Sequence, residues 1–504
     1  MADLKQQVVH GVVWAALERF STQLVGFCVS IVLARLLAPD DYGTIALLSI
    51  FLAISDSLVG GGFTSALVQK KDATKTDFNS VFYLQLAMSL FMYVILFLAA
   101  PTIARFYRTP VLVPVLRVIA VSVVFSGING VQNAELSRGM KFNASFRISL
   151  IQSIVSGAVG VGLAFAGYGV WALVWSSIAG AFIGMVTRWF VIAWRPSWVF
   201  SWSALSNLFR FGWKLAISSL LDVAYSNLYG LLIGRFYTKT DLAFVNKGNS
   251  VPRLAMDSIN GTLGRVAFPA LSKLQDRRDV LRESMRKIIK TSTFFVFPLM
   301  AGCAVCAPSI IRILFGRQWM PAVPYVQVAC FQFALWPFHT VNLQAIAAIG
   351  RSDIFLILEI VKKVFGLVVL MLSMRQGPFV FVCAVAFVAG PFSVLVNTWP
   401  NVRLLKYGVL MQLRDVLPTA AVALMMAAVC QVEALLFSGE KLSEHFLLLV
   451  IQITSGAIIF AVLSLLFRLD AARVFLESMC MATKGKASKM VNSIAWLMRK
   501  RFGV

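Results

Sequence analysis

The sequence predicts an all-α membrane protein that crosses the bilayer many times. Of its 504 residues, 59% are hydrophobic and only 13% are charged, whereas soluble domains carry about 25% charged residues. Apolar runs of about twenty residues, long enough to span the hydrocarbon core as a helix, recur from Val12 to Leu466. The runs are continuous rather than alternating, which disfavours a β-barrel. We therefore expect about fourteen transmembrane helices.

The expected spans are joined by short loops on one side of the membrane and by longer hydrophilic segments on the other. The short loops include LLAPDD and AGYG. The longer segments are residues 194–210, 272–290 and 400–415, together with the tail that begins at Arg468. The expected spans cover residues 11–34, 43–69, 80–104, 111–131, 145–167, 169–192, 211–235, 241–264, 292–315, 323–348, 352–374, 378–398, 416–437 and 444–467.

Lysine and arginine gather on the side of the longer segments, which carries roughly three times as many of them as the other side. Segment 272–290, for example, contains Lys273, Arg277, Arg278 and Arg282. By the positive-inside rule this side is cytoplasmic, and both termini are expected there. The net charge of +24 is then a consequence of topology, and no nucleic-acid partner is expected. The start MADLKQQVVH leads directly into a long span, so we expect no cleavable signal peptide.

The sequence contains no pattern for catalysis or metal binding. It has no Walker A motif, no HExxH and no GxSxG. The histidines His10, His339 and His445 lie far apart. Cys303 and Cys306 have CxxC spacing but lie in the apolar segment FPLMAGCAVCAP, which indicates helix packing rather than a metal or redox site. We expect no catalytic residue, no cofactor and no bound metal.

A weak internal repeat predicts that the chain consists of two related halves. The segment LARLLAPDDYG (33–43) aligns without a gap with IGRFYTKTDLA (233–243), and the alignment matches an arginine and an aspartate in each. Each segment closes the first span of its half and opens the second. Duplicated halves are common in secondary transporters, where the substrate site lies between them.

The joint between the halves is expected in the tryptophan-rich segment WRPSWVFSWSALSNLFRFGW (194–213), which suits a position at the membrane interface. Two further helices and a tail follow the second half. The expected organisation is an N-terminal lobe in residues 1–193, an interfacial cytoplasmic linker in residues 194–210, a C-terminal lobe in residues 211–399, two helices in residues 400–467 and a basic amphipathic cytoplasmic tail in residues 468–504.

Charged residues inside the expected spans are the strongest indication of a function. The segment FLILEIVKKVFGLVVLMLS (355–373) places Glu359, Lys362 and Lys363 near the middle of a span. A charged group at this depth costs about 2.5–3.5 kcal/mol on insertion scales and is a functional hypothesis by default. The alternative is structural: Glu359 can pair with the lysines at i+3 and i+4 while their stems extend towards the interface.

The span at 241–264 carries a polar stripe along one helical face. Its members recur at spacings of three and four, so they must face water or protein rather than lipid. Polar side chains also follow the span at 211–235, including Asp222. A hydrated cavity explains several stripes at once, whereas a network of paired helices is the alternative. The stripe consists of Asn246, Asn249, Arg253, Asp257 and Asn260.

The intramembrane cations are expected at successive depths of the bilayer. Arg19 and Lys362 lie in the cytoplasmic half, Arg253 near the middle and Lys247 in the outer half, if the N-terminus is cytoplasmic. An anionic substrate that crosses between the halves would then always have a cationic partner nearby. This arrangement predicts transport of an anion.

Three segments resemble bacterial polysaccharide flippases of the Wzx/WzxC-like type, in the polysaccharide transporter family of the multidrug/oligosaccharidyl-lipid/polysaccharide (MOP) exporter superfamily. They are VLARLLAPDDYGTIAL, GRVAFPALSKLQ (264–275) and PFHTVNLQAIAAIGRSDIFLILEIVKK (337–363). The resemblance implies two six-helix lobes around a central cavity and two C-terminal helices. It implies alternating access that moves a polyprenyl-pyrophosphate-linked oligosaccharide from the cytoplasmic to the outer leaflet of a bacterial inner membrane, for exopolysaccharide, O-antigen or capsule export.

The resemblance also implies a cationic cavity that holds the pyrophosphate. Of the candidate residues, Lys362 and Lys363 lie inside a family-like motif, whereas the assignment of the others depends on their expected depth in the membrane. The expected partners are the lipid-linked oligosaccharide, membrane lipids and polysaccharide polymerase or export machinery. The candidate substrate-binding residues are Arg19, Lys247, Asn249, Arg253, Asn260, Lys362 and Lys363, and the candidates for coupling to H⁺ or Na⁺ are Asp222, Asp257 and Glu359.

Other functions remain as alternatives to a polysaccharide flippase. A MATE-type exporter of small cations predicts that acidic groups dominate the cavity. A flippase for the lipid-linked peptidoglycan precursor shares the superfamily but agrees less well with the three motifs. A membrane glycosyltransferase or polymerase predicts dependence on a metal or a sugar donor. A scaffold for a polysaccharide assembly complex predicts that the intramembrane charges can be neutralised without loss of export.

Overall fold

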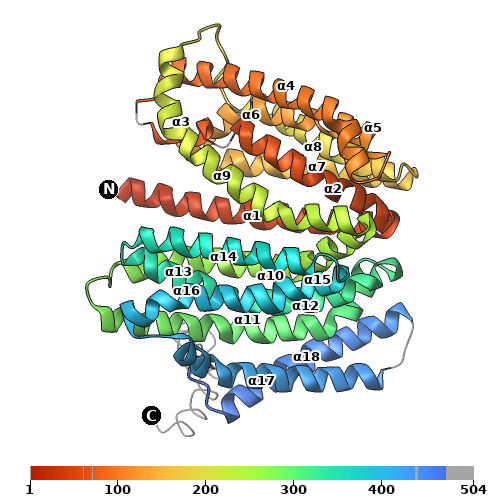
Figure 1. Ribbon diagram of the computed structural model, residues 1–504, viewed down its shortest axis with the longest axis vertical. Helices are drawn as coiled ribbons and strands as arrows, with labels where there is room; N and C mark the ends of the chain where they lie inside the picture. Colours follow the sequence, from red (N-terminus) through yellow and green to blue (C-terminus); the bar gives the residue numbers. More distant parts are fainter. Residues whose placement is uncertain (1, 61, 71, 438–440, 473–504) are drawn as a thin grey trace. The chain divides into compact units, whose positions relative to one another are not determined.

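The structure is a computed structural model that describes residues 2–60, 62–70, 72–437 and 441–472. Every regular element in these ranges is a helix (Figure 1). The chain divides into two compact units, Met1–Ala243 (unit 1) and Phe244–Val504 (unit 2). The lobe boundaries expected at residues 194–210 and 399 stay a prediction, and most of the expected basic tail, from residue 473 onward, lies outside the described residues.

Unit 1 is built from long helices that pack in pairs. The most extensive packing is between α7 and α8, α1 and α7, α4 and α6, and α2 and α9. The helix α4 starts where the sequence provides a capping box: the Thr74 hydroxyl accepts from the backbone N–H of Asp77, and the Asp77 carboxylate accepts from the backbone N–H of Thr74. The helices are α1 (Ala2–Leu36), α2 (Pro39–Gly60), α3 (Phe63–Gln69), α4 (Lys75–Phe106), α5 (Leu112–Ile119), α6 (Val121–Arg138), α7 (Phe142–Phe165), α8 (Val170–Val191) and α9 (Trp202–Phe236).

Unit 2 is organised around its longest helix, α11, which packs against α12, α13, α16, α17 and α18. Its core includes Leu281, Met285 and Ile289 of α11 and Phe338 and Val341 of α13, all buried. The elements are α10 (Lys239–Ser272), which begins in unit 1, α11 (Arg278–Leu314), the 3-10 helix η1 (Arg317–Ala322), α12 (Val323–Ala334), α13 (Trp336–Ala348), α14 (Ser352–Ser373), α15 (Pro378–Ala384), the π-helical turn η2 (Val385–Ala389), α16 (Gly390–Leu405), α17 (Val409–Leu436) and α18 (Leu442–Leu466).

Eleven helical segments in the described part of the chain are long and apolar enough to cross a membrane. The three other expected spans coincide with α10, with α12 and α13 together, and with α14. Each departs from a simple span for a local reason: α10 carries the polar stripe, the break between α12 and α13 comes just before Pro337, and α14 contains several charges. The prediction of an all-α polytopic membrane protein is confirmed.

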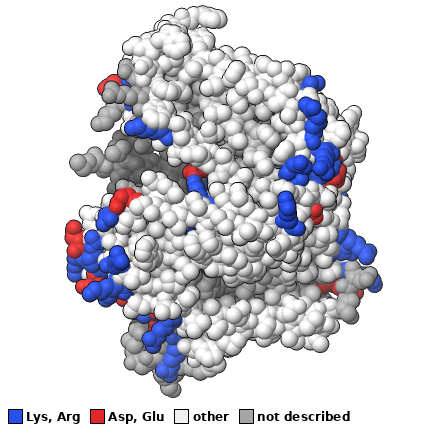
Figure 2. All heavy atoms as spheres, viewed as in Figure 1, with Lys and Arg blue, Asp and Glu red and all other residues white. Residues whose placement is uncertain are grey.

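The surface agrees with a position in the bilayer. On the face drawn in Figure 2, lysine, arginine, aspartate and glutamate gather near the ends of the helices, and uncharged residues form most of the surface between. Large apolar side chains such as Phe190, Leu221 and Leu356 are exposed on helices. In a membrane protein such side chains face lipid, where their exposure carries no penalty.

The two copies of the sequence repeat have the same local structure. The helix α1 ends at Leu36 and α2 begins at Pro39, whereas α9 ends at Phe236 and α10 begins at Lys239. In the first junction the Asp41 carboxylate accepts from the backbone N–H of Ala38 at 3.2 Å. In the second, Asp241 accepts from the N–H of Thr238 at 3.0 Å. The aspartates matched by the alignment therefore cap equivalent helices.

The tryptophan-rich segment after α8 is attached to unit 1 by specific contacts. The Asn79 side chain donates to the Ser197 hydroxyl at 2.6 Å and accepts from the Ser197 backbone N–H at 3.1 Å. Trp194 packs against Phe78 and Phe82, whereas the ring of Trp198 is almost fully exposed. An exposed indole near a partly buried one suits the expected position at the interface, which stays a prediction.

Candidate functional site

The polar stripe of α10 exposes a charged group at the middle of the helix. The Arg253 side chain is 65% exposed, and its Nε lies 3.5 Å from Oδ2 of Asp257, one turn further on. Asp257 and Asn249 are partly buried, and Asn246 is exposed. An arginine in the middle of a membrane helix is stable only where water or a counter-charge reaches it. The guanidinium is therefore not enclosed by the packing of unit 2, and its counter-charge is Asp257.

The far end of the stripe is held by a neighbouring helix. Asn260 of α10 accepts a hydrogen bond from the Thr340 hydroxyl of α13. On α13, the adjacent His339 is joined through Nδ1 to the Asn397 side chain of α16 at 3.0 Å. The predicted residue Asn260 is thus part of an interhelical hydrogen-bond network inside unit 2, and His339 belongs to the helix packing.

The charges of α14 form an ion pair within the helix. Lys362 Nζ lies 2.5 Å from Oε1 of Glu359, and the lysine is more buried than the glutamate. Lys363, next in the chain, is partly buried. The pairing at i+3 is the structural alternative that the sequence already offered. It satisfies Glu359 with one lysine and leaves the second lysine outside that pair.

Lys247 lies in a different environment from the other predicted cations. It is only 6% exposed, and its ammonium nitrogen lies 4.2 Å from the ring centroid of Phe315 and 5.3 Å from that of Trp319. Aromatic faces stabilise a cation that has been removed from water. The side chain therefore points into the interior of unit 2.

Two predicted residues belong to unit 1. Arg19 on α1 and Asp222 on α9 are both exposed. The neighbouring Glu18 accepts a hydrogen bond from the Ser149 hydroxyl of α7 at 2.7 Å, which joins these two helices. Packing within unit 1 therefore leaves both charged side chains exposed.

Sequence reasoning missed a buried cluster of amides that ties α13, α16 and α17 together. The Asn342 side chain donates to Gln412 Oε1 at 3.0 Å and accepts from Gln412 Nε2 at 3.0 Å and from Asn401 Nδ2 at 2.8 Å. All three side chains are buried. Neutral amides in an apolar segment give no sequence signal that they contact each other, although Asn342 lies within the motif PFHTVNLQ.

A second feature beyond the predicted site is a buried carboxylate next to this cluster. Asp415 is 6% exposed and receives two hydrogen bonds from Arg286, both 2.6 Å long. The Tyr407 hydroxyl donates to the same carboxylate at 2.8 Å. Burial and the bond to Asp415 raise the pKa of Tyr407, so this hydroxyl stays protonated. Basic residues in the long hydrophilic segments, which the sequence explained by topology alone, thus also have specific partners.

The profile of a family described as "polysaccharide biosynthesis protein" matches residues 32–324. The match covers more than half of the chain. The chain belongs to the polysaccharide biosynthesis protein family. The matched region contains the α10 stripe and Asp222 but ends before the charges of α14.

Curated relatives of this family member include proteins of polysaccharide pathways. Teichuronic acid biosynthesis protein TuaB of Bacillus subtilis (strain 168) is 23% identical over 91% of this chain and 95% of its own length. Lipopolysaccharide biosynthesis protein WzxC of Escherichia coli (strain K12) is 22% identical over 65% and 67%. Succinoglycan biosynthesis transport protein ExoT of Rhizobium meliloti (strain 1021) is 25% identical over 63% and 64%. The resemblance to Wzx-like proteins expected from the motifs is confirmed.

Solved structures show a similar fold. The lipid II flippase MurJ, in an inward closed conformation, superposes with a TM-score of 0.70 at 15% identity and covers 90% of this chain and 98% of MurJ. An inward-facing MATE transporter of the MOP superfamily superposes with a TM-score of 0.57 at 16% identity, over 78% and 99%. The polysaccharide biosynthesis protein therefore has the MurJ- and MATE-like fold that its sequence predicted.

Proposed function

We propose that this protein moves a polyprenyl-pyrophosphate-linked oligosaccharide from the cytoplasmic to the outer leaflet of a bacterial inner membrane, by alternating access through a cationic cavity. The observation that carries the proposal is the exposed Arg253 at the middle of α10. Membership of the polysaccharide biosynthesis protein family and the likeness to the transport protein ExoT support an exported glycan as cargo.

The physical requirement for such a protein follows from the cargo. A hydrated glycan cannot enter hydrocarbon, because each polar group that loses its hydrogen bonds costs several kcal/mol, of order 2–7. A polar path supplies replacement partners, and the prenyl tail can stay in lipid. The pyrophosphate is the most strongly charged part, so cations along the path matter more than any neutral group.

The proposed binding residues combine cations from two ion pairs with neutral side-chain amides. Arg253 and Lys362 each have a carboxylate partner on the same helix, Asp257 and Glu359. A pyrophosphate that takes over the cation would release the carboxylate. The released carboxylate could then accept H⁺ or Na⁺, which couples substrate binding to ion binding. Arg19, Lys363, Asn249 and Asn260 complete the proposed set, and Asp222 is the proposed coupling group on α9.

We leave Lys247 out of the proposed contacts. Its ammonium group is enclosed by Phe315 and Trp319, so it could reach a phosphate only after the rings move. We assign Lys247 a supporting role instead, in which its buried charge adds to the positive potential of α10. The proposed orientation places both termini in the cytoplasm, since the basic segments lie on the side of the N-terminus.

The proposal is tested by reconstitution. Proteoliposomes receive a lipid-linked oligosaccharide with a labelled glycan, and an external enzyme or quencher reports the accessible fraction in each leaflet over time. Arg253→Gln should lower the flipping rate by at least about tenfold, because one charge-assisted hydrogen bond is worth about 1.5–3 kcal/mol. The matched control is Arg403→Gln, which removes an exposed arginine at the end of α16.

Two results would contradict the proposal. Equal flipping rates for wild type and Arg253→Gln would contradict the cationic path. If the wild type flips no lipid-linked glycan, the proposed function itself is wrong. Charge reversal in Arg253→Glu separates the proposal from a MATE-type exporter. An exporter of small cations should gain transport from the added carboxylate, whereas a pyrophosphate flippase should lose it.

A further inference from the structure

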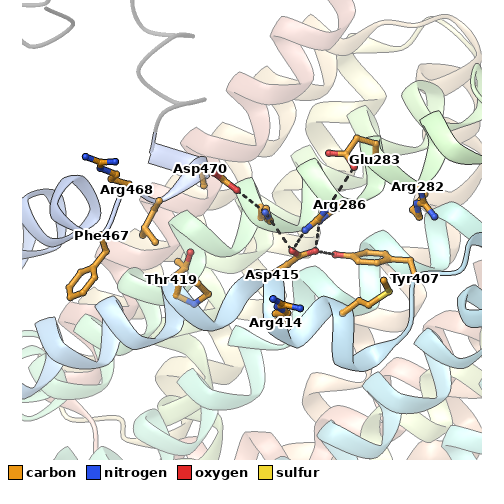
Figure 3. A pocket seen from close by; sticks show the side chains of 15 residues that line it. Arg282, Glu283, Arg286, Tyr407, Arg414, Asp415, Thr419, Phe467, Arg468 and Asp470 are labelled. Carbon is orange, nitrogen blue, oxygen red and sulfur yellow. Dashed lines mark hydrogen bonds and ion pairs between the residues drawn. The ribbon is translucent and has the colours of Figure 1, made fainter. Parts of the chain in front are cut away.

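A cationic pocket lies at the end of unit 2 where α11 and α17 begin and α18 ends. Its volume is about 640 Å³. Three segments line it: the first turns of α11, the start of α17 with the preceding Tyr407, and residues 467–471 after α18. Figure 3 shows how side chains from these segments surround the central carboxylate of Asp415. The lining contains five arginines and lysines but only three acidic residues.

The floor of the pocket is fixed by ion pairs that use up most of its negative charge. Arg286 binds Asp415 through two hydrogen bonds of 2.6 Å. Lys290 lies 3.5 Å from Asp415 and 2.9 Å from Asp470. These contacts join α11, α17 and the segment after α18 into one rigid base. The two acidic groups are thus balanced by two cations.

The rim of the pocket carries the excess positive charge. Arg282, Arg414 and Arg468 line it, and the remaining acidic residue is Glu283. Arg282 is bound only weakly, at 3.6 Å, to an almost fully exposed aspartate on its own helix, Asp279. Guanidinium groups match the geometry of phosphate oxygens and bind them through paired hydrogen bonds. A phosphate group is therefore the ligand that the rim fits best.

An apolar groove adjoins the cationic pocket. It is formed by the end of α16 and the start of α17, and Met411 lines both the groove and the pocket. The groove has a volume of about 690 Å³ and is lined mainly by aliphatic side chains and Trp399. Leu410 in its wall is 83% exposed. A charged pocket beside an apolar groove matches an amphiphile with an anionic head, and not a free ion.

We propose that the pocket and groove together bind one anionic phospholipid, with its headgroup in the pocket whose rim carries Arg282, Arg414 and Arg468 and an acyl chain along Trp399 and Leu410. Basic pockets between membrane helices bind anionic headgroups in this way. The bound lipid would connect α11, α16, α17 and the segment after α18. The inference concerns one end of these helices and does not depend on which substrate the protein transports.

Binding can be measured on the purified full-length protein in detergent. Native mass spectrometry counts bound phosphatidylglycerol over a titration, with phosphatidylcholine as the neutral lipid and inorganic phosphate as competitor. The test variant is Arg282→Gln/Arg414→Gln/Arg468→Gln, which leaves the Arg286–Asp415 pair intact. The matched control, Lys273→Gln/Arg277→Gln/Arg403→Gln, removes three exposed cations that do not line the pocket.

Wild type and control should bind phosphatidylglycerol with equal affinity, and the test variant should bind it at least about tenfold more weakly. Unchanged affinity in the test variant would overturn the proposal. Complete displacement of the lipid by inorganic phosphate at equal concentration would also overturn it, because the groove would then contribute nothing. If the triple variant does not fold, Arg414→Gln alone should still weaken binding, since this residue is exposed.

The groove is tested separately by fluorescence. Phosphatidylglycerol with brominated acyl chains quenches indole rings on contact, and Trp399 should contribute part of the quenching. Trp399→Phe should lose that part, whereas Trp198→Phe, which removes an exposed tryptophan of unit 1, should keep it. Identical quenching in wild type and Trp399→Phe would show that no acyl chain lies in the groove.

Discussion

Lys239 Nζ lies 2.6 Å from Oδ2 of Asp40, so a direct ion pair joins the two copies of the sequence repeat. Asp40 precedes the capping aspartate of the α1–α2 junction, and Lys239 is the first residue of α10. The Thr240 hydroxyl adds a hydrogen bond of 3.2 Å to the same carboxylate. The repeat therefore has a structural consequence beyond its shared caps, because equivalent junctions contact each other.

Charge reversal tests this ion pair. Lys239→Glu should lower the free energy of unfolding by about 1 kcal/mol, because it replaces attraction by repulsion at a partly exposed site. The exchange Asp40→Lys/Lys239→Asp should restore most of the loss. Thermal unfolding in detergent, followed by intrinsic fluorescence, measures both. A double variant as unstable as Lys239→Glu would show that the charges do not interact.

The same junction predicts a severe effect at Gly43. A Cβ at this position would lie 2.1 Å from the backbone oxygen of Lys239, a distance that forces the two segments apart. Overpacking of this kind costs about 1–3 kcal/mol, so Gly43→Ala should lower the unfolding temperature clearly. Gly26→Ala is the control, since no atom lies within 4 Å of its added Cβ. It should be neutral or stabilising by up to about 1 kcal/mol. Equal effects at both positions would contradict the close approach.

The parts of the fold that depend on local pattern could be predicted from the sequence. Apolar runs gave the spans, and the alignment of Asp41 with Asp241 anticipated two caps of the same type. The stripe with Arg253 and Asp257 was predictable because neighbours at i+4 are fixed by helix geometry. The i+3 pair of Glu359 with Lys362 was foreseen as the structural alternative for the same reason.

Contacts between distant segments could not be predicted. Asn342 and Gln412 are separated by seventy positions, and nothing in either segment shows that their amides meet. The position of Lys247 on its helix suggested a place on a path for anions. The rings of Phe315 and Trp319 that enclose its ammonium group lie about seventy positions further along the chain, so the sequence around Lys247 did not reveal them. Hydrophobic periodicity specifies which face of a helix is polar but not which neighbour covers it.

The buried amide cluster predicts a large loss of stability from a nearly isosteric change. Gln412→Leu removes one hydrogen bond from each polar atom of the Asn342 side chain, which keeps its bonds to the Phe338 carbonyl and to Asn401. The loss of two buried hydrogen bonds, each worth about 0.5–1.5 kcal/mol, should cost about 1–3 kcal/mol. The variant should therefore unfold at a lower temperature than wild type. The control Gln275→Leu changes an exposed glutamine after α10 and should stay within about 0.5 kcal/mol. No difference between the two would mean that the cluster adds nothing to stability.

The pair of Glu359 and Lys362 allows structural and transport roles to be separated. Lys362→Ala leaves the Glu359 carboxylate without its 2.5 Å partner, so both stability and flipping should fall. In the double variant Glu359→Ala/Lys362→Ala the unpaired charge is gone and stability should recover. If Lys362 binds the pyrophosphate, flipping should stay low in the double variant although the protein is as stable as wild type. Recovery of both stability and flipping would make Lys362 a structural counter-ion of Glu359. Lys363 would then be the cation of α14 that binds the substrate, and Lys363→Ala in the same proteoliposomes tests this role.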